Sequence, residues 1–233
     1  MREKKFTDNF LYEERFGFKE RNSNFLFYLF ITCILIVFTV WRVCWVDKHE
    51  MVQVEGWSMK QTLRDNQWLL LDKSVEAERG DIIVVDVRRY AEFNYGKNGT
   101  THLIKRLIAI EGDKVRCQKG KLEICNADTG YQWQEVDESG YAYYEKLSKC
   151  SFEEYEVKEG EVFFLGDNRN NSMDSRYKEG NSRLDRLYKA EDIYGVVTPW
   201  ALENSETLET VFVSIPLSIQ NFFKDIGKIF GIK

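Results

Sequence analysis

The first residue that suggests chemistry is Ser58, in the segment Gly56-Trp57-Ser58-Met59. A serine hydroxyl can attack a carbonyl carbon when a neighbouring group takes its proton. Serine is equally common in turns, where it has no chemical role. The segment alone does not decide between these two interpretations, so a base must be sought elsewhere in the chain.

The best candidate for that base is Lys105, inside the apolar run 102–110. If this run is a strand, Lys105 shares one face with Leu103 and Leu107, because side chains alternate along a strand. Burial would lower the pKa of the lysine, since the charged form loses solvation, and a neutral lysine can act as a general base. The alternative is an edge-strand lysine whose amine reaches water and stays charged.

A third feature is the polar segment 165–176, which follows another apolar run and is rich in turn-forming and hydrogen-bonding residues. Within it, Asp174 and Arg176 could form an ion pair, and Ser172 could bond to a nearby base. Loops of this kind often hold a site in place, although a solvent-exposed polar loop is the alternative.

A Ser-His-Asp triad is the competing scheme. The chain contains only two histidines, His49 and His102. His49 lies where an apolar segment ends, and His102 has no obvious carboxylate partner in the sequence. A Ser-Lys dyad needs fewer groups and is therefore favoured.

Three cysteines lie in the polar part of the chain, at Cys117, Cys125 and Cys150. Their spacing does not match a zinc site, so we expect no metal and no cofactor. An odd number of cysteines does not indicate a disulfide framework, although one bridge between Cys125 and Cys150 is compatible with the sequence.

Short apolar runs separated by turn residues must position these side chains, and they predict a mainly β, antiparallel domain. We expect strands at 51–54, 68–71, 82–87, 103–110, 114–117, 122–125, 162–165 and 193–197. Lys119-Gly120 predicts a hairpin between two of them. The acidic stretch at about 126–161 is interpreted as an inserted lobe or surface loop that stays solvated and has no function.

Residues 22–46 predict a transmembrane anchor, because residues 22–41 carry no charge and a membrane span needs roughly twenty apolar residues. Trp41 and Trp45 are typical of a membrane interface. A cleaved signal peptide would have a shorter apolar core that ends in small residues, and a buried helix is the other alternative. Lysine and arginine are more frequent before this run, which predicts that residues 1–21 are cytoplasmic.

The domain 47–200 would then lie outside the cytoplasm. The tail 201–233 has apolar residues at helical spacing, so it predicts an amphipathic helix that packs on the domain or lies on the membrane surface. These residues are Ile219, Phe222, Phe223, Ile226, Ile229 and Phe230. The formal net charge of −5 argues against nucleic acid as a partner.

The segments around the candidate residues resemble, in order, the sequence blocks of the bacterial type I signal peptidases, in the form typical of Gram-positive bacteria. The matching segments are 56–63, 79–85, 104–113, 166–176 and 192–197. The family consists of membrane-anchored serine proteases with a Ser-Lys dyad. The resemblance implies that Ser58 is the nucleophile and Lys105 the general base.

By the same resemblance, Ser172 orients the lysine, while Asp174 and Arg176 brace the site. Members with serine at the position of Gly56 use its hydroxyl for the oxyanion. With glycine there, backbone N–H groups, including that of Ser58, must bind the oxyanion. The sequence departs from the family at Gln61, where proline is usual, and at 109–111, where Gly-x-Pro is frequent.

The resemblance also implies an endopeptidase that removes signal peptides from exported preproteins after small residues at positions −1 and −3, as in Ala-x-Ala. Shallow apolar pockets would be lined by Val52, Val54, Met59, Leu63, Val84, Leu103 and Ile104. We expect preproteins and the lipid bilayer of the plasma membrane as partners, and a monomeric enzyme.

Two alternatives remain beside this interpretation. One is a Ser-Lys peptidase of the kind that processes conjugation pilins. The other is a membrane-tethered binding module without catalytic activity. Self-cleaving repressors also use a Ser-Lys dyad, but they carry a DNA-binding domain and no anchor, so the sequence does not fit them.

Overall fold

The computed structural model describes residues 2–90, 101–146, 151–176, 188–218 and 220–221, with side chains from residue 24 onward. The chain divides into two compact units, Met1–Lys48 and His49–Lys233. Each unit is described by itself.

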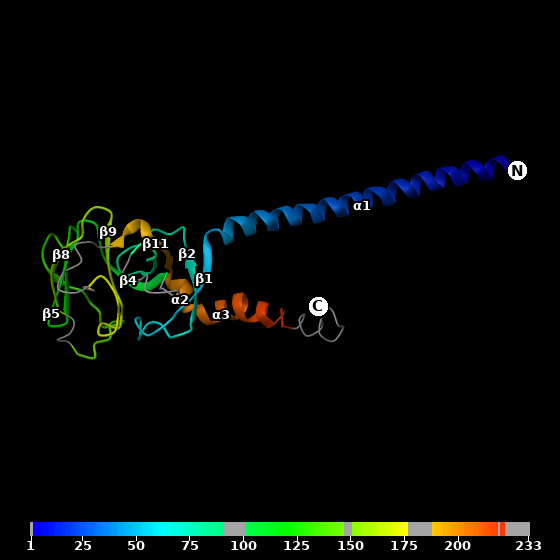
Figure 1. Cartoon of the computed structure of the whole chain (residues 1–233). Coiled ribbons are helices and arrows are strands. Elements are labelled where there is room, and N and C mark those ends of the chain that lie inside the picture. Colours follow the sequence, from blue (N-terminus) through cyan, green and yellow to red (C-terminus); the bar gives the residue numbers. More distant parts are fainter. Residues whose placement is uncertain (1, 91–100, 147–150, 177–187, 219, 222–233) are drawn as a thin grey trace. The chain divides into compact units, whose positions relative to one another are not determined.

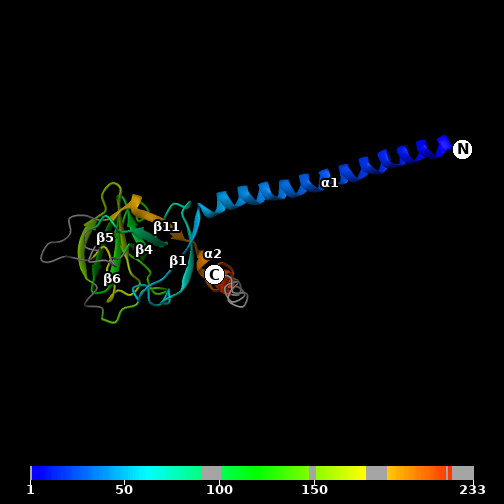
Figure 2. The ribbon, with the colours of Figure 1, turned by 45° about the vertical axis from the view of Figure 1, so that its right-hand side comes forward.

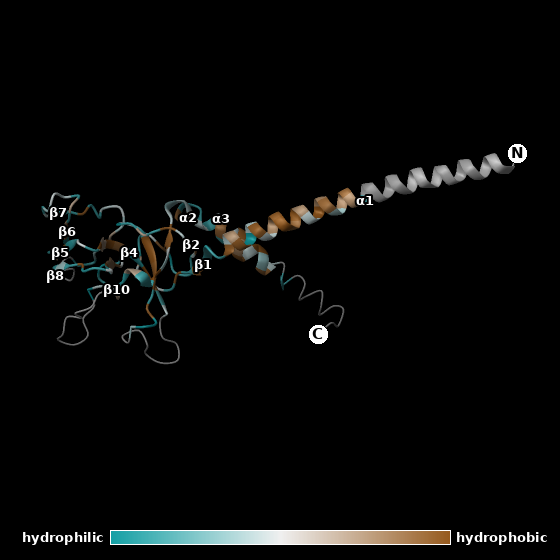
Figure 3. Ribbon diagram, turned by 90° about the horizontal axis from the view of Figure 1, so that it is seen from above, coloured by the Kyte–Doolittle hydropathy of each residue, from teal (hydrophilic) through white to brown (hydrophobic). Residues whose placement is uncertain are grey.

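The first unit is the helix α1 (Arg2–Val46). Its part Asn24–Val46 has 23 residues with a hydropathy of 2.3 and is, in the described part of the chain, the one helix long and apolar enough to cross a membrane. Its apolar residues are exposed along the whole part, and Figure 3 shows this part of the ribbon coloured mostly as hydrophobic. A helix that is apolar all round is suited to lipid. The rings of Trp41 and Trp45 stack with centroids 6.1 Å apart.

The second unit contains a seven-stranded antiparallel sheet that carries most of the predicted strands (Figure 1). In spatial order its strands are β1 (His49–Gln53), β2 (Trp68–Asp72), β11 (Ile193–Val197), β3 (Ile82–Asp86), β4 (His102–Ile110), β9 (Glu161–Leu165) and β10 (Tyr188–Lys189). Strand β1 is therefore an edge strand, whereas β4 lies between β3 and β9. The mainly β, antiparallel fold predicted from the sequence is confirmed.

A smaller sheet of four antiparallel strands completes the unit. Its order is β7 (Gln134–Glu135), β6 (Lys121–Cys125), β5 (Lys114–Gln118) and β8 (Phe152–Glu156). The hairpin between β5 and β6 turns at Lys119 and Gly120, with φ angles of 53° and 81°, as two-residue hairpin loops require. Among the described residues Cys125 forms no disulfide, and Cys150 lies outside them.

Two apolar clusters form the core, and strands β4 and β9 contribute to both. Leu107 and Phe164 are buried in the first cluster, whereas Ile108 and Phe163 are buried in the second. Alternating side chains of the same two strands thus point into opposite layers. Figure 2 shows β4 beside β5 and β6 in this unit. A strand fixed on both faces gives a rigid support to any side chain it carries.

The stretch 126–161, predicted to be a solvated lobe or surface loop, contains two features that its sequence did not predict. This stretch contains the strand β8, which pairs with β5 along Lys114↔Glu156 and Val115↔Tyr155. It was missed because its sequence is rich in glutamate and has no apolar run. The stretch also contains Glu138, which is buried against Arg169 of the polar loop 166–176.

After β11 the chain forms α2 (Pro199–Glu203), α3 (Ser205–Glu209) and the π-helix η4 (Thr210–Ser214), and a short 3₁₀ helix η3 (Ala190–Asp192) precedes β11. Ala201, Ser205 and Leu208 are buried, and both α2 and α3 contact β2. The beginning of the tail therefore packs on the domain. Its predicted amphipathic part, with Ile219 and the apolar residues from Phe222 onward, lies outside the described residues.

Candidate active site

The structure brings Ser58 and Lys105 together, although 47 positions separate them in the sequence. The Nζ atom of Lys105 lies 2.8 Å from the Oγ atom of Ser58. Only 3% of Lys105 is exposed. Burial lowers the pKa of this amine to about 8, against the opposing charges of Asp174 and Asp167. At pH 7 roughly a tenth of the lysine is therefore neutral, far more than for an ordinary lysine, and the lone pair of this form can take the serine proton.

Strand pairing explains why Lys105 is held there. Strand β3 pairs with β4 through Ile83↔Lys105, whereas β9 pairs with β4 only from Arg106 onward. The lysine thus stands at the point where β4 leaves β9 and one of its edges becomes free. The amine also donates a hydrogen bond of 2.9 Å to the carbonyl oxygen of Ile104, which fixes its direction.

Residues 54–67 carry Ser58 and are called the nucleophile loop, after the role that the sequence predicts for this serine. The two ends of the loop are hydrogen-bonded to each other. The N–H of Val54 donates to the carbonyl of Gln67 at 2.9 Å, and the N–H of Asn66 donates to the carbonyl of Val54 at 2.8 Å. Gly56 has a φ of +83°, a conformation that favours glycine. Its N–H donates to Asp65 at 2.8 Å, so this N–H is occupied. The N–H of Ser58 makes no hydrogen bond within the described residues, and it stays available to a ligand.

The bracing loop, residues 166–176, is hydrogen-bonded to backbone carbonyl groups of the nucleophile loop. The N–H of Asn168 donates to the carbonyl of Ser58 at 2.9 Å, and its side-chain amide donates to the carbonyl of Trp57 at 3.0 Å. A Cβ atom on Gly166 would lie 2.1 Å from Ser172 Oγ and 2.6 Å from the Ser58 carbonyl oxygen. Only glycine allows the two loops to approach this closely.

Asp174 and Arg176 form the predicted ion pair inside this loop. Two nitrogens of Arg176 donate to the two carboxylate oxygens at 2.8 and 2.7 Å, and the N–H of Gly166 donates to Asp174 at 3.0 Å. Burial raises the pKa of the Asp174 carboxyl, but the hydrogen bonds and charge of Arg176 outweigh it, so the pKa lies below its ordinary value. This pair keeps an ionised carboxylate near the amine of Lys105.

Ser172 is held beside Gly166, with its Oγ atom buried. The hydrogen bond expected from Ser172 to Lys105 is not formed; the amine bonds to Ser58 and Ile104. The structure therefore places Ser172 in the bracing loop without a hydrogen bond to Lys105.

A second ion pair, between Arg106 and Asp167, was missed by the sequence analysis. Arg106 donates two hydrogen bonds to the Asp167 carboxylate at 2.9 and 2.8 Å, and Thr62 donates a third at 2.5 Å. Asp167 is fully buried. Side chains alternate along a strand, so Arg106 lies on the face of β4 opposite Lys105. A charged residue directly after the candidate base was a signal from which this ion pair could have been predicted. This pair ties the nucleophile loop, β4 and the bracing loop together.

Gln61 has a φ of 92°. Proline is fixed near −65° and cannot adopt this conformation. The nucleophile loop of this chain therefore follows a backbone path at Gln61 that is incompatible with the proline usual in the resembling family.

Ser58 and Lys105 line a groove of about 720 Å³. Most of the residues predicted to bind substrate line the same groove: Val52, Val54, Met59, Val84, Leu103 and Ile104. Leu63 was predicted with them, but it is buried in the nucleophile loop and does not line the groove. The groove runs between the edge strand β1 and the part of β4 that β9 leaves unpaired. Both strands offer backbone groups to an extended chain.

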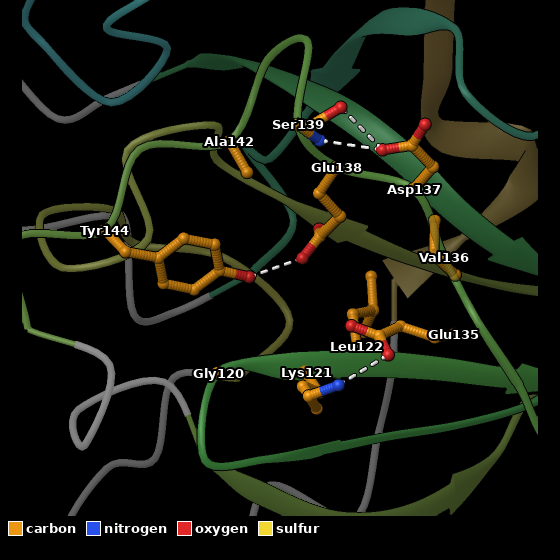
Figure 4. Close-up of a pocket in the computed structure, with 10 residues that line it drawn as sticks. All are labelled: Gly120, Lys121, Leu122, Glu135, Val136, Asp137, Glu138, Ser139, Ala142 and Tyr144. Atoms are coloured by element: carbon orange, nitrogen blue, oxygen red, sulfur yellow. Dashed lines mark hydrogen bonds and ion pairs between the residues drawn. The ribbon is translucent and has the colours of Figure 1, made fainter.

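Another cavity, of about 420 Å³, lies between the β5–β6 hairpin and residues 135–144 (Figure 4). Lys121 is paired with Glu135 at 2.7 Å, and the hydroxyl of Tyr144 donates to Glu138. Glu138 in turn lies 2.5 Å from Arg169 of the bracing loop. Its serine, Ser139, bonds to Asp137, whereas its lysine, Lys121, bonds to Glu135. Through Glu138 the cavity wall supports the bracing loop.

A buried lysine in contact with a serine, in a groove bordered by two strand edges, is the arrangement of a serine peptidase with a lysine base. The sequence model of the family "Signal peptidase, peptidase S26" matches residues 24–200. The chain belongs to this family, and its enzyme class is that of signal peptidase I, a serine endopeptidase.

Two curated relatives from Bacillus agree with this assignment. The chain is 33% identical over 149 residues to signal peptidase I U of Bacillus subtilis (strain 168), covering 60% of this chain and 72% of the relative. It is 31% identical over 163 residues to signal peptidase I of Bacillus licheniformis, covering 68% and 82%. A crystal structure of a signal peptidase I from Enterococcus faecalis V583 matches with a TM-score of 0.36 and 25% identity, over 53% of this chain and 98% of that chain.

Proposed function

We propose that Ser58 is the nucleophile of this signal peptidase and that Lys105 is its general base. The observation that carries the proposal is the 2.8 Å contact between Lys105 Nζ and Ser58 Oγ, with an amine whose pKa burial lowers to about 8. The neutral amine takes the proton of Ser58 as Oγ attacks the scissile carbonyl carbon. The protonated amine then gives this proton to the leaving nitrogen.

The resulting acyl-enzyme is an ester of Ser58 with the signal peptide. Lys105, neutral again, takes a proton from a water molecule whose oxygen attacks the ester carbonyl. The proton returns to Ser58 Oγ as the C–O bond breaks. In both steps the unoccupied N–H of Ser58 is the donor for the oxyanion.

An extended preprotein segment fits between the free edges of β1 and β4. With the residue at −1 beside Ser58, the side chains at −1 and −3 point to the same side, because the period of a strand is two residues. That side is the apolar floor formed by Val52, Val54, Met59, Val84, Leu103 and Ile104. A floor made of apolar side chains favours small apolar residues such as alanine at these two positions, which supports cleavage after an Ala-x-Ala sequence.

The apolar segment Asn24–Val46 would anchor the enzyme in the plasma membrane as a single span. The excess of lysine and arginine before this segment supports a cytoplasmic N-terminus and an extracytoplasmic peptidase unit. The enzyme would act as a monomer beside the bilayer in which its preprotein substrates are held.

The test is cleavage of a model preprotein by the full chain in detergent or liposomes, with the cut site mapped by mass spectrometry. We expect Ser58→Ala and Lys105→Ala to lower the rate by at least about a thousandfold. Glu159→Gln, an exposed carboxylate outside the groove, is the matched control and should retain the wild-type rate. Wild-type cleavage by Lys105→Ala would refute the lysine mechanism.

A further inference from the structure

The end of the groove remote from the dyad is polar, although its middle is apolar. Glu50 of β1, His102 of β4 and Tyr194 of β11 all line it. The hydroxyl of Tyr194 donates to Glu50 at 2.6 Å, and its ring centroid lies 5.1 Å from that of His102. The three side chains therefore form one cluster across the groove, from one bordering strand to the other.

One carboxylate oxygen of Glu50 accepts hydrogen bonds from neighbouring side chains, and the other is available to a ligand. Both Tyr194 and Lys73, the latter at 3.2 Å, bond to Oε2. The Oε1 atom makes no hydrogen bond within the described part of the chain, and the side chain of Glu50 is 45% exposed. The Tyr194 hydrogen bond, together with Lys73, lowers the pKa of Glu50 in spite of the desolvation that opposes it. An ionised acceptor is thus held in place and faces the groove.

We propose that Glu50 selects the preprotein residue at position −5, where it favours a hydrogen-bond donor, with lysine or arginine preferred over a neutral amide and glutamate disfavoured. The inference rests on the proposed function, since it takes position −1 to lie beside Ser58. It adds a specificity-determining residue outside the apolar pockets for −1 and −3.

The position follows from strand geometry. His102 precedes Lys105 by three residues, which corresponds to about 10 Å along an extended strand. A substrate segment that is also extended covers about 10 Å in three to four residues. The residue beside His102 is therefore about three to four positions before −1. The side chains at −1 and −3 face the apolar floor of the groove, and side chains alternate along an extended chain. The next side chain that faces the groove therefore belongs to −5, whereas those at −4 and −6 point away from it. The cluster therefore meets −5.

The test compares purified full-length enzyme on preproteins that differ only at −5, with lysine, glutamine or glutamate, by measuring kcat and KM. For the wild-type enzyme, we expect kcat/KM to be about two- to fivefold higher for the preprotein with lysine at −5 than for the one with glutamate. This factor corresponds to the free energy of an exposed ion pair. The difference should reside mainly in KM. The same substitutions at −4 should have no comparable effect, because that side chain points away.

Glu50→Lys should reverse the order of the lysine and glutamate substrates, and Glu50→Gln should remove the difference. Tyr194→Phe retains the ring and removes the donor that holds Oε2, so it should reduce the preference. Glu159→Gln should keep the wild-type order. An unchanged order in Glu50→Lys, with active enzyme, would overturn the inference while leaving the proposed function intact. Failure of the proposed function itself would show as cleavage that survives Ser58→Ala.

Discussion

The carbonyl oxygen of Ser58 accepts a 2.9 Å hydrogen bond from the backbone N–H of Asn168, 110 residues further along the chain. The side chain of the same Asn168 holds the carbonyl of Trp57 at 3.0 Å. The peptide groups on both sides of Ser58 are therefore fixed by one residue of the bracing loop. This arrangement orients Ser58 Oγ toward Lys105 before any substrate binds.

Asn168→Ala should lower kcat by about tenfold to a hundredfold, because small misplacements of a nucleophile are costly. The backbone bond to Ser58 remains, so the fold should survive and KM should change little. Asn171→Ala, in the same loop, is the control and should be close to wild type. Single-turnover cleavage of a model preprotein measures the effect. Equal rates for both variants would contradict the role given to Asn168.

The rate of cleavage should rise with pH through about 8, the pKa to which burial lowers the amine of Lys105. The active form is the neutral amine, so kcat/KM should fall about tenfold per unit below that pH and level off above it. Initial rates between pH 6 and 9.5 measure the midpoint. A profile that is flat across this range would exclude Lys105 as the titrating base.

Asp174→Asn should move this midpoint to lower pH, since the charge of Asp174 opposes the lowering of the Lys105 pKa. It should also reduce the free energy of unfolding by about 3 kcal/mol, because it leaves the largely buried Arg176 without its counter-charge. Asp128→Asn is the control, since Asp128 is 76% exposed beside Arg79 and should contribute less than about 1 kcal/mol. Denaturant unfolding and the pH profile separate the two effects.

Gly166→Ala should abolish cleavage and destabilise the domain by about 1–3 kcal/mol, the range of overpacked sites. Its Cβ would lie 2.6 Å from the Ser58 carbonyl oxygen, which cannot move without displacing the nucleophile. Gly140→Ala is the matched control, because nothing lies within 4 Å of its added Cβ. Retained activity in Gly166→Ala would show that the two loops are less tightly fitted than the 2.6 Å distance indicates.

Gln61→Gly should raise the free energy of unfolding by about 1 kcal/mol, since a side chain at a φ of 92° is strained and glycine is not. Gln61→Pro should lower it, because proline cannot adopt that angle. Gln132→Gly, at a position with an ordinary backbone angle, should instead destabilise slightly. Thermal unfolding of the three variants tests the assignment, and stabilisation by proline would contradict it.

The sequence was sufficient to predict the eight apolar strands, the apolar helical segment near the N-terminus and the pairing of Ser58 with Lys105. Apolar runs of strand length and an uncharged run of membrane length are local patterns. Lys105 was recognised because a charged residue interrupts an apolar strand. Of the residues predicted to bind substrate, all but Leu63 line the groove beside Ser58 and Lys105.

Tertiary structure decided what depends on contacts between distant segments. The strand β8 exists because β5 offers it an edge, and the pair Arg106–Asp167 forms because the bracing loop returns to β4. The same is true of the lowered pKa of Lys105, since desolvation depends on every group that surrounds the amine. Residue types and their local spacing are written in the sequence, whereas the distances that make Ser58 and Lys105 a chemical pair arise only when the two loops and β4 pack together.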